Sequence, residues 1–107
     1  MNEPTLRELA QRLQQFADER DWGRFHAPKN LASALIVEAA ELLEPFQWMS
    51  EEASRQLDAA QKQEVASEMA DVLLYLVQLS NALGVDLMQA AMDKMALNAQ
   101  RFPPTAK

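Results

Sequence analysis

The stretch DVLLYLVQL, Asp71 to Leu79, decides what kind of fold this sequence can adopt. Read as a helix, its apolar residues surround almost the whole circumference, at positions 72, 73, 74, 76, 77 and 79. A helix that is apolar all round must be buried on all sides. Four helices from one chain of 107 residues can hardly wrap it. We therefore expect other subunits to cover part of it, in a symmetric dimer or tetramer.

The sequence around this stretch divides into helices with recognisable ends. Thr5, Ser50 and Asp86 are expected helix caps, and Pro45 and Gly84 are expected stops. The helices predicted from these signals span about 5–21, 31–44, 50–57, 59–83 and 86–101, with a loop over 22–30. The expected fold class is all-α, a four-helix-bundle protomer in a single domain over 1–107, with an ordered core over about 5–102.

Composition excludes several classes of site. The chain has no cysteine, which removes disulfides, thiolate metal sites and cysteine nucleophiles, and its single His26 excludes any site that needs two histidines. A net charge of −6 argues against a surface for polymeric nucleic acid. No secretory signal is visible and no apolar run approaches the roughly 20 residues of a membrane span. A cytoplasmic protein without a membrane partner is expected.

Two acid pairs stand beside the apolar stripes of neighbouring predicted helices. Glu38 and Glu41 flank the stripe of the second helix, and Glu68 and Asp71 flank that of the helix over 59–83. On the latter, Tyr75 continues the acidic flank, and the expected core stripe is Val65, Met69, Val72, Leu76 and Leu83. If the two helices pack antiparallel by these faces, four carboxylates converge.

Converging carboxylates cannot all remain ionised unaided, because buried like charges are costly. Either some are protonated or cations neutralise them, and an all-oxygen ligand set suits Mg²⁺ or Mn²⁺. The alternative is that both pairs are ordinary acids on solvated helix faces. A di-iron carboxylate bundle is excluded, because no histidine follows either pair at the required spacing.

Four blocks of the sequence, in the same order, resemble the MazG-like all-α nucleoside triphosphate pyrophosphohydrolases, and most closely their dCTP pyrophosphatase branch. They are RDWGRFHAPKNL (20–31), EAAELLEPFQW (38–48), EMADVLLYL (68–76) and KMALNAQRFP (94–103). The family's metal motif is usually EExxE followed by ExxD. Val37 replaces its first glutamate here, so only Glu38 and Glu41 match the first part, together with Glu68 and Asp71.

This resemblance implies a MazG-like helical domain and Mg²⁺-dependent hydrolysis of a nucleoside triphosphate to the monophosphate and pyrophosphate. All four acids become expected metal ligands. Glu38 or Glu41 becomes the residue expected to orient or deprotonate the attacking water. The implied substrate is dCTP or a modified pyrimidine deoxynucleotide, and the implied role is sanitation of the nucleotide pool.

The same resemblance implies residues that contact the substrate. Lys94, Asn98 and Arg101 recur at i, i+4 and i+7 on the last helix and are expected, with Lys29, to contact phosphates or sugar. A solvated helix face is the alternative for the three on the last helix. The aromatic residues Trp22, Trp48 and Tyr75 are expected to contact the base. His26 is either a nucleotide contact, of this or a neighbouring subunit, or a structural loop residue.

Two other functions remain open at this point. The preferred substrate of such an enzyme is alternatively dUTP or a noncanonical purine triphosphate. The other alternative is that the chain is a non-catalytic helical oligomer whose acids are surface or partner-binding groups.

Overall fold

The computed structural model describes residues 3–105, and this part of the chain contains helices and no strand. The helices, in chain order, are α1 (Leu6–Glu19), the 3₁₀ helix η1 (Trp22–Phe25), α2 (Pro28–Leu43), α3 (Glu51–Ser54), α4 (Ala59–Leu83) and α5 (Leu87–Arg101). The all-α class is therefore confirmed. Residues 1–2 and 106–107, which the predicted domain includes, lie outside the described residues.

The predicted caps set several helix ends. The Thr5 side chain accepts a hydrogen bond from the backbone N–H of Glu8 at 3.1 Å, which begins α1. The Asp86 side chain accepts from a backbone N–H to cap α5, as predicted. Asp58, which was not among the predicted caps, begins α4 with a capping box. Gly84 ends α4 with φ of 68°, a left-handed conformation that favours glycine. The helix predicted over 59–83 has the same bounds in the structure.

The predicted loop over 22–30 is shorter than expected. Residues Trp22–Phe25 form the 3₁₀ turn η1, and α2 begins at Pro28 instead of at Leu31. The physical reason is that proline is tolerated in the first turn of a helix, where its missing N–H would lack a partner anyway. Pro28 therefore starts the helix that it was expected to precede.

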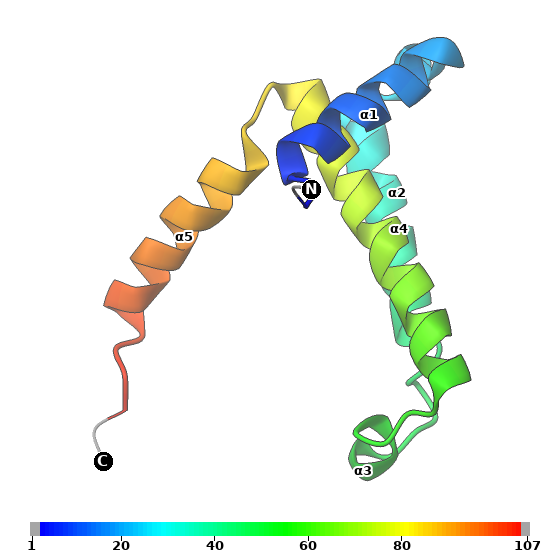
Figure 1. The fold of residues 1–107 in the computed structure, drawn as a ribbon, viewed down its shortest axis with the longest axis vertical. Helices are drawn as coiled ribbons and strands as arrows, with labels where there is room; N and C mark the ends of the chain where they lie inside the picture. The colour runs from blue at the N-terminus through cyan, green and yellow to red at the C-terminus, as the bar shows by residue number, and fades with distance from the viewer. Residues whose placement is uncertain (1–2, 106–107) are drawn as a thin grey trace.

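Three helices form the packed part of the protomer. In Figure 1, α2 and α4 run antiparallel and side by side, and α1 crosses the end of this pair. The buried apolar residues among those described are Ala17 of α1, Leu31 of α2 and Val77 of α4. The Asn81 amide of α4 donates to the Ala10 carbonyl oxygen of α1 at 2.9 Å, which fixes the crossing point.

Helix α5 leaves the packed helices, so one chain does not close a four-helix bundle. The chain bends by 103° between α4 and α5, and Figure 1 shows α5 pointing away from α2 and α4. The radius of gyration is 17.0 Å, compared with about 13 Å for a compact domain of this length. The predicted bundle is thus not confirmed within a protomer. The physical reason is that the apolar pattern of a helix gives its bounds and its apolar face, but not its direction relative to the helix before it.

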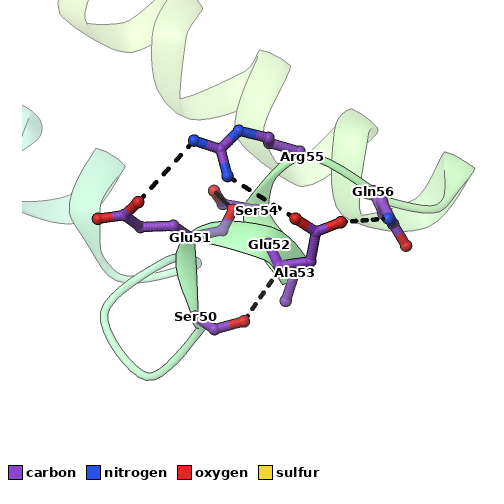
Figure 2. Close-up of polar contacts among 7 residues, drawn as sticks. All are labelled: Ser50, Glu51, Glu52, Ala53, Ser54, Arg55 and Gln56. Atoms are coloured by element: carbon purple, nitrogen blue, oxygen red, sulfur yellow. Dashed lines mark hydrogen bonds and ion pairs between the residues drawn. The ribbon is translucent and has the colours of Figure 1, made fainter.

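The turn between α2 and α4 is built from local polar contacts around α3. Figure 2 shows the Ser50 hydroxyl accepting from the Ala53 backbone N–H at 3.0 Å, and Arg55 pairing with Glu51 and Glu52 at 3.8 Å each. All of these groups are exposed, so each pair contributes at most about 1 kcal/mol. Their role is to position the turn rather than to hold the helices together.

No single helix between residues 3 and 105 is long and apolar enough to cross a membrane. Taken together across their 103° bend, α4 and α5 have the length and the apolar composition that a membrane span requires, but neither helix has both alone.

Candidate metal and nucleotide site

Three glutamates from α2 and α4 converge where the two helices lie side by side. Glu38 and Glu41 are one helical turn apart on α2, and Glu68 lies on α4. One carboxylate oxygen from each lies within 4.8 Å of the others, and all three residues are half-buried. Antiparallel packing therefore brings Glu68 beside the predicted pair Glu38 and Glu41. Asp71, one turn after Glu68, lies outside this group of three, although its charge raises the pKa of Glu38 and Glu68.

Crowding of the acids is visible in the pKa of Glu38, which is raised above its ordinary value. The main cause is a hydrogen bond with the Glu41 side chain, followed by burial and by repulsion from Glu41, Asp71 and Glu68. A raised pKa favours the protonated form of the Glu38 carboxyl group, whereas a bound divalent cation would favour its ionised form.

The pKa of Glu68, on the neighbouring helix α4, is also raised. Burial raises its pKa first, and repulsion from Glu41 and Asp71 raises it further, with smaller effects from Glu44 and Glu64. The Oε2 atoms of Glu38 and Glu68 are both buried without a hydrogen-bond partner. Buried polar atoms are rarely left unpaired.

These observations fit a hard divalent cation. The cluster offers several carboxylate oxygens and no nitrogen or sulfur ligand, which is the donor set that Mg²⁺ and Mn²⁺ prefer. A cation between the two helices would satisfy the unpaired oxygens of Glu38 and Glu68 and relieve the repulsion among the acids. The residues present therefore fit the metal that the sequence analysis expected.

A pocket of about 610 Å³ adjoins the acids through Asp71. Its walls come from α1, η1 and α4, and most of them are apolar or aromatic. The lining residues are Leu9, Arg12, Leu13, Phe16, Trp22, Phe25, His26, Asp71, Leu74, Tyr75 and Gln78. Pockets of this size and composition, with a few polar groups, are typical of small-molecule sites.

Two of the predicted aromatic contacts and the single histidine meet in this pocket. The rings of Trp22 and Phe16 make an edge-to-face contact with centroids 5.4 Å apart. The His26 ring lies 6.1 Å from that of Trp22, and Tyr75 enters from α4. The 3₁₀ helix η1 contains Trp22 and ends at His26, and both residues line the pocket. The aromatic wall thus shares the cavity with Asp71, whose charge also acts on Glu38 and Glu68.

The other predicted substrate contacts lie elsewhere. Lys29 is exposed in the first turn of α2, and Trp48 follows α2 with 90% of its surface exposed. Lys94, Asn98 and Arg101 lie on α5, which points away from the acids (Figure 1). None of the five residues lines the pocket. Within one chain, the structure does not bring these five residues to the candidate site.

Several lining residues were not predicted as site residues. Leu9, Leu13 and Phe16 recur at helical spacing, which predicts only an apolar stripe on the first helix. No motif singled out Arg12 or Gln78. An apolar stripe does not tell whether another helix or a ligand will cover it. The spacing of Gln78 from Asp71, two helical turns on one face, was the signal available for it.

The fold and the acidic cluster define the class of protein. The model of the MazG-like family matches residues 34–104, which contain both acid pairs, and the chain belongs to this family. The recognition made from the four sequence blocks is therefore confirmed.

Particular relatives are similar over most of the chain. The dCTP pyrophosphatase 1 of Mus musculus is 44% identical and that of Homo sapiens 41% identical, each over 103 residues and 94% of this chain. The chain spans 61% of the length of these relatives. The crystal structure of a pyrophosphatase from Archaeoglobus fulgidus has a TM-score of 0.87 at 37% identity, covering 97% of both chains.

Proposed function

We propose that this protein is a Mg²⁺-dependent pyrophosphohydrolase that converts dCTP or modified pyrimidine deoxynucleoside triphosphates to monophosphates and pyrophosphate. The observation that carries the proposal is the pair of buried, unpartnered carboxylate oxygens on Glu38 and Glu68, beside a pocket of nucleotide size. The proposed metal ligands are Glu38, Glu41, Glu68 and Asp71. The expected role is sanitation of the nucleotide pool.

Each group in the site has a task in this reaction. Bound Mg²⁺ supplies charge that offsets the repulsion between a triphosphate and its nucleophile. Glu38 or Glu41 orients the attacking water and accepts its proton. Asp71 lines the pocket, and its charge raises the pKa of Glu38 and Glu68, so it is proposed to lie between the reacting phosphates and the nucleoside.

The pocket is proposed to bind the nucleoside. Trp22 and Tyr75 offer faces or edges for the base, and His26 is placed to contact the same ligand. The preference for dCTP rests on the relatives that are named dCTP pyrophosphatases. Stacking tolerates every base, so the choice among bases must come from hydrogen bonds and from the size of the pocket.

A second copy of the chain is proposed to complete the structure. The protomer exposes 8654 Å², compared with roughly 6000 Å² for a compact monomer of its mass. The apolar residues Met88, Met92 and Met95 form one exposed face of α5. A symmetric dimer or tetramer buries such faces.

The same assembly explains how the remaining substrate contacts reach a site. Lys94, Asn98 and Arg101 of α5 are proposed to contact the phosphates or sugar bound by a neighbouring subunit. Lys29 and the exposed Trp48 are proposed to contribute in the same way. A cation such as Lys94 would neutralise charge on the leaving pyrophosphate.

The proposal is tested by incubating the purified protein with a panel of canonical and modified nucleoside triphosphates, with and without Mg²⁺. Monophosphate and pyrophosphate are the expected products, with dCTP or a modified pyrimidine fastest. Orthophosphate and diphosphate as products would contradict the cleavage position. A preference for dUTP or a noncanonical purine would replace the proposed substrate while leaving the reaction intact.

Two variants locate the reaction at the acids. Glu41→Gln and Asp71→Asn are expected to abolish turnover, because each removes a proposed metal ligand. Glu51→Gln is the matched control, since Glu51 is an exposed acid in the first turn of α3, away from the pocket, and its side chain pairs with Arg55 at 3.8 Å. A ligand variant that turns over at the wild-type rate would remove that residue from the metal set.

A further inference from the structure

One polar side chain of the pocket has no role in the reaction as proposed so far. Gln78 lines the cavity from α4 and is half-buried. Among the hydrogen bonds found within residues 3–105, none involves its carboxamide. Its neighbours in the wall are mainly leucine and aromatic side chains. A polar group held in such surroundings has a strong tendency to pair with whatever ligand fills the pocket.

The position of Gln78 along α4 indicates which part of a ligand it meets. Asp71, Leu74, Tyr75 and Gln78 all line the pocket and recur at i, i+3, i+4 and i+7, which is one face of a helix. Two turns separate Asp71 from Gln78, about 10 Å along the axis. A nucleotide whose phosphates lie at the acids and which extends along this face therefore places its base at the Gln78 end.

Helix α1 crosses α4 near this end of the pocket. Asn81, one turn beyond Gln78, donates to the Ala10 carbonyl at 2.9 Å, which holds α1 against α4 here. Leu9, Arg12 and Leu13 of α1 line the same cavity. A carboxamide partly buried among apolar groups makes stronger hydrogen bonds than one in water. Of the polar groups that line the pocket from α4, Gln78 is the neutral one that both donates and accepts through its amide.

We propose that Gln78 is a specificity-determining residue whose carboxamide reads the hydrogen-bonding edge of the bound pyrimidine. This inference rests on the proposed function. The amide offers an N–H₂ donor beside a carbonyl acceptor. Cytosine presents an amino donor beside the N3 acceptor, and the two groups match as a bidentate pair. Rotation of the carboxamide by half a turn matches the O4 acceptor and N3–H donor of uracil or thymine.

Substitutions at Gln78 are therefore expected to lower activity on the pyrimidine nucleotides. Gln78→Met keeps the length of the side chain and removes both hydrogen bonds, so kcat/KM for each pyrimidine falls on the order of tenfold to a hundredfold. The loss appears mainly in KM. Gln78→Glu only accepts, so it keeps one hydrogen bond, to the cytosine amino group or to the uracil N3–H. It repels the acceptor beside that donor, which is N3 of cytosine or O4 of uracil. For this variant kcat/KM falls for dCTP and dUTP alike, on the order of tenfold or more.

The experiment measures kcat and KM for dCTP, dUTP, dTTP and dATP with the wild type and both variants. Gln63→Met is the matched control, since Gln63 is an exposed glutamine of α4 outside the pocket, and the wild-type ranking is expected for it. Thermal unfolding with and without Mg²⁺ establishes that each variant folds and keeps the metal site. If Gln78→Met does not fold, Gln78→Glu, which preserves the size and polarity of the side chain, decides alone.

The outcomes separate this inference from the function on which it rests. If the wild type releases no pyrophosphate from any nucleotide, the proposed function fails and the inference fails with it. If the wild type is active and folded Gln78 variants keep its kcat/KM for dCTP, dUTP and dTTP, the role of Gln78 alone is overturned. An equal loss for all four substrates would also overturn it, because a purely structural residue would produce that pattern.

Discussion

Met95 lies on the apolar face of α5 and has 67% of its surface exposed in the protomer. If a second copy covers this face, Met95→Glu will weaken the assembly. Burying the exposed part of a methionine contributes about 1 to 2 kcal/mol to the free energy of association. A glutamate at this position loses that contribution and adds a desolvation cost of several kcal/mol.

A symmetric interface contains the substitution twice. The loss of the methionine contacts alone is then about 2 to 4 kcal/mol, which corresponds to a dissociation constant weaker by roughly thirtyfold to a thousandfold. The available surface is large enough for such an interface. The excess over a compact monomer is about 2600 Å² per chain, within the range of obligate assemblies when two chains contribute.

Sedimentation velocity at micromolar concentration is the assay. The wild type is expected to sediment as a dimer or tetramer and Met95→Glu as a monomer or a concentration-dependent mixture. Gln63→Glu controls for the added charge at an exposed site on α4 outside this face. A wild type that is monomeric and unfolds cooperatively would refute the reasoning, because the protomer would then be stable with its apolar face in water.

Three further outcomes are expected. Glu68→Gln will raise the thermal midpoint of the metal-free protein, because it removes repulsion between like charges. It will also abolish the stabilisation by Mg²⁺. An unchanged shift of the thermal midpoint by Mg²⁺ would exclude Glu68 as a ligand. Leu31→Ala, at a site only 2% exposed, will lower the free energy of unfolding in urea by about 2 to 5 kcal/mol, and a loss under 1 kcal/mol would show that Leu31 is not central to the core. The third outcome concerns Asp86, whose pKa is lowered by a hydrogen bond from the Gln89 backbone N–H and by Arg7. The ionised Asp86 therefore stabilises the fold above the ordinary pKa of 3.8, and this stabilisation is lost as pH falls through the lowered pKa. Urea unfolding between pH 3 and 7 will therefore show a smaller acid loss for Asp86→Asn, and parallel curves for the two proteins would contradict this.

The local features of the fold were predictable from the sequence because their causes are local. Asp58 and Gly84 mark the ends of α4 through a side-chain cap and a left-handed residue, and both operate within one turn. The meeting of Glu38 with Glu68 followed from helical periodicity and antiparallel packing of two neighbouring helices. Such inferences need no knowledge of distant contacts.

Features that depend on what covers a surface were not predictable. Met69 was expected in the core stripe of α4 and is 57% exposed in the protomer, and Leu83 is also exposed. Leu13 and Phe16 recur at helical spacing on α1, a pattern that predicts packing against another helix, and they line the pocket. The pattern of apolar residues gives the face to be covered, but it does not say whether another helix, a second chain or a ligand covers it.

Phosphorus NMR of dCTP incubated with the protein and Mg²⁺ tests the central claim most directly, with Glu68→Gln in parallel. Signals of dCMP and pyrophosphate are expected to grow with the wild type, and to be absent with Glu68→Gln or without Mg²⁺. Formation of dCDP and orthophosphate, no reaction, or equal turnover by Glu68→Gln would contradict an acidic Mg²⁺ site that releases pyrophosphate.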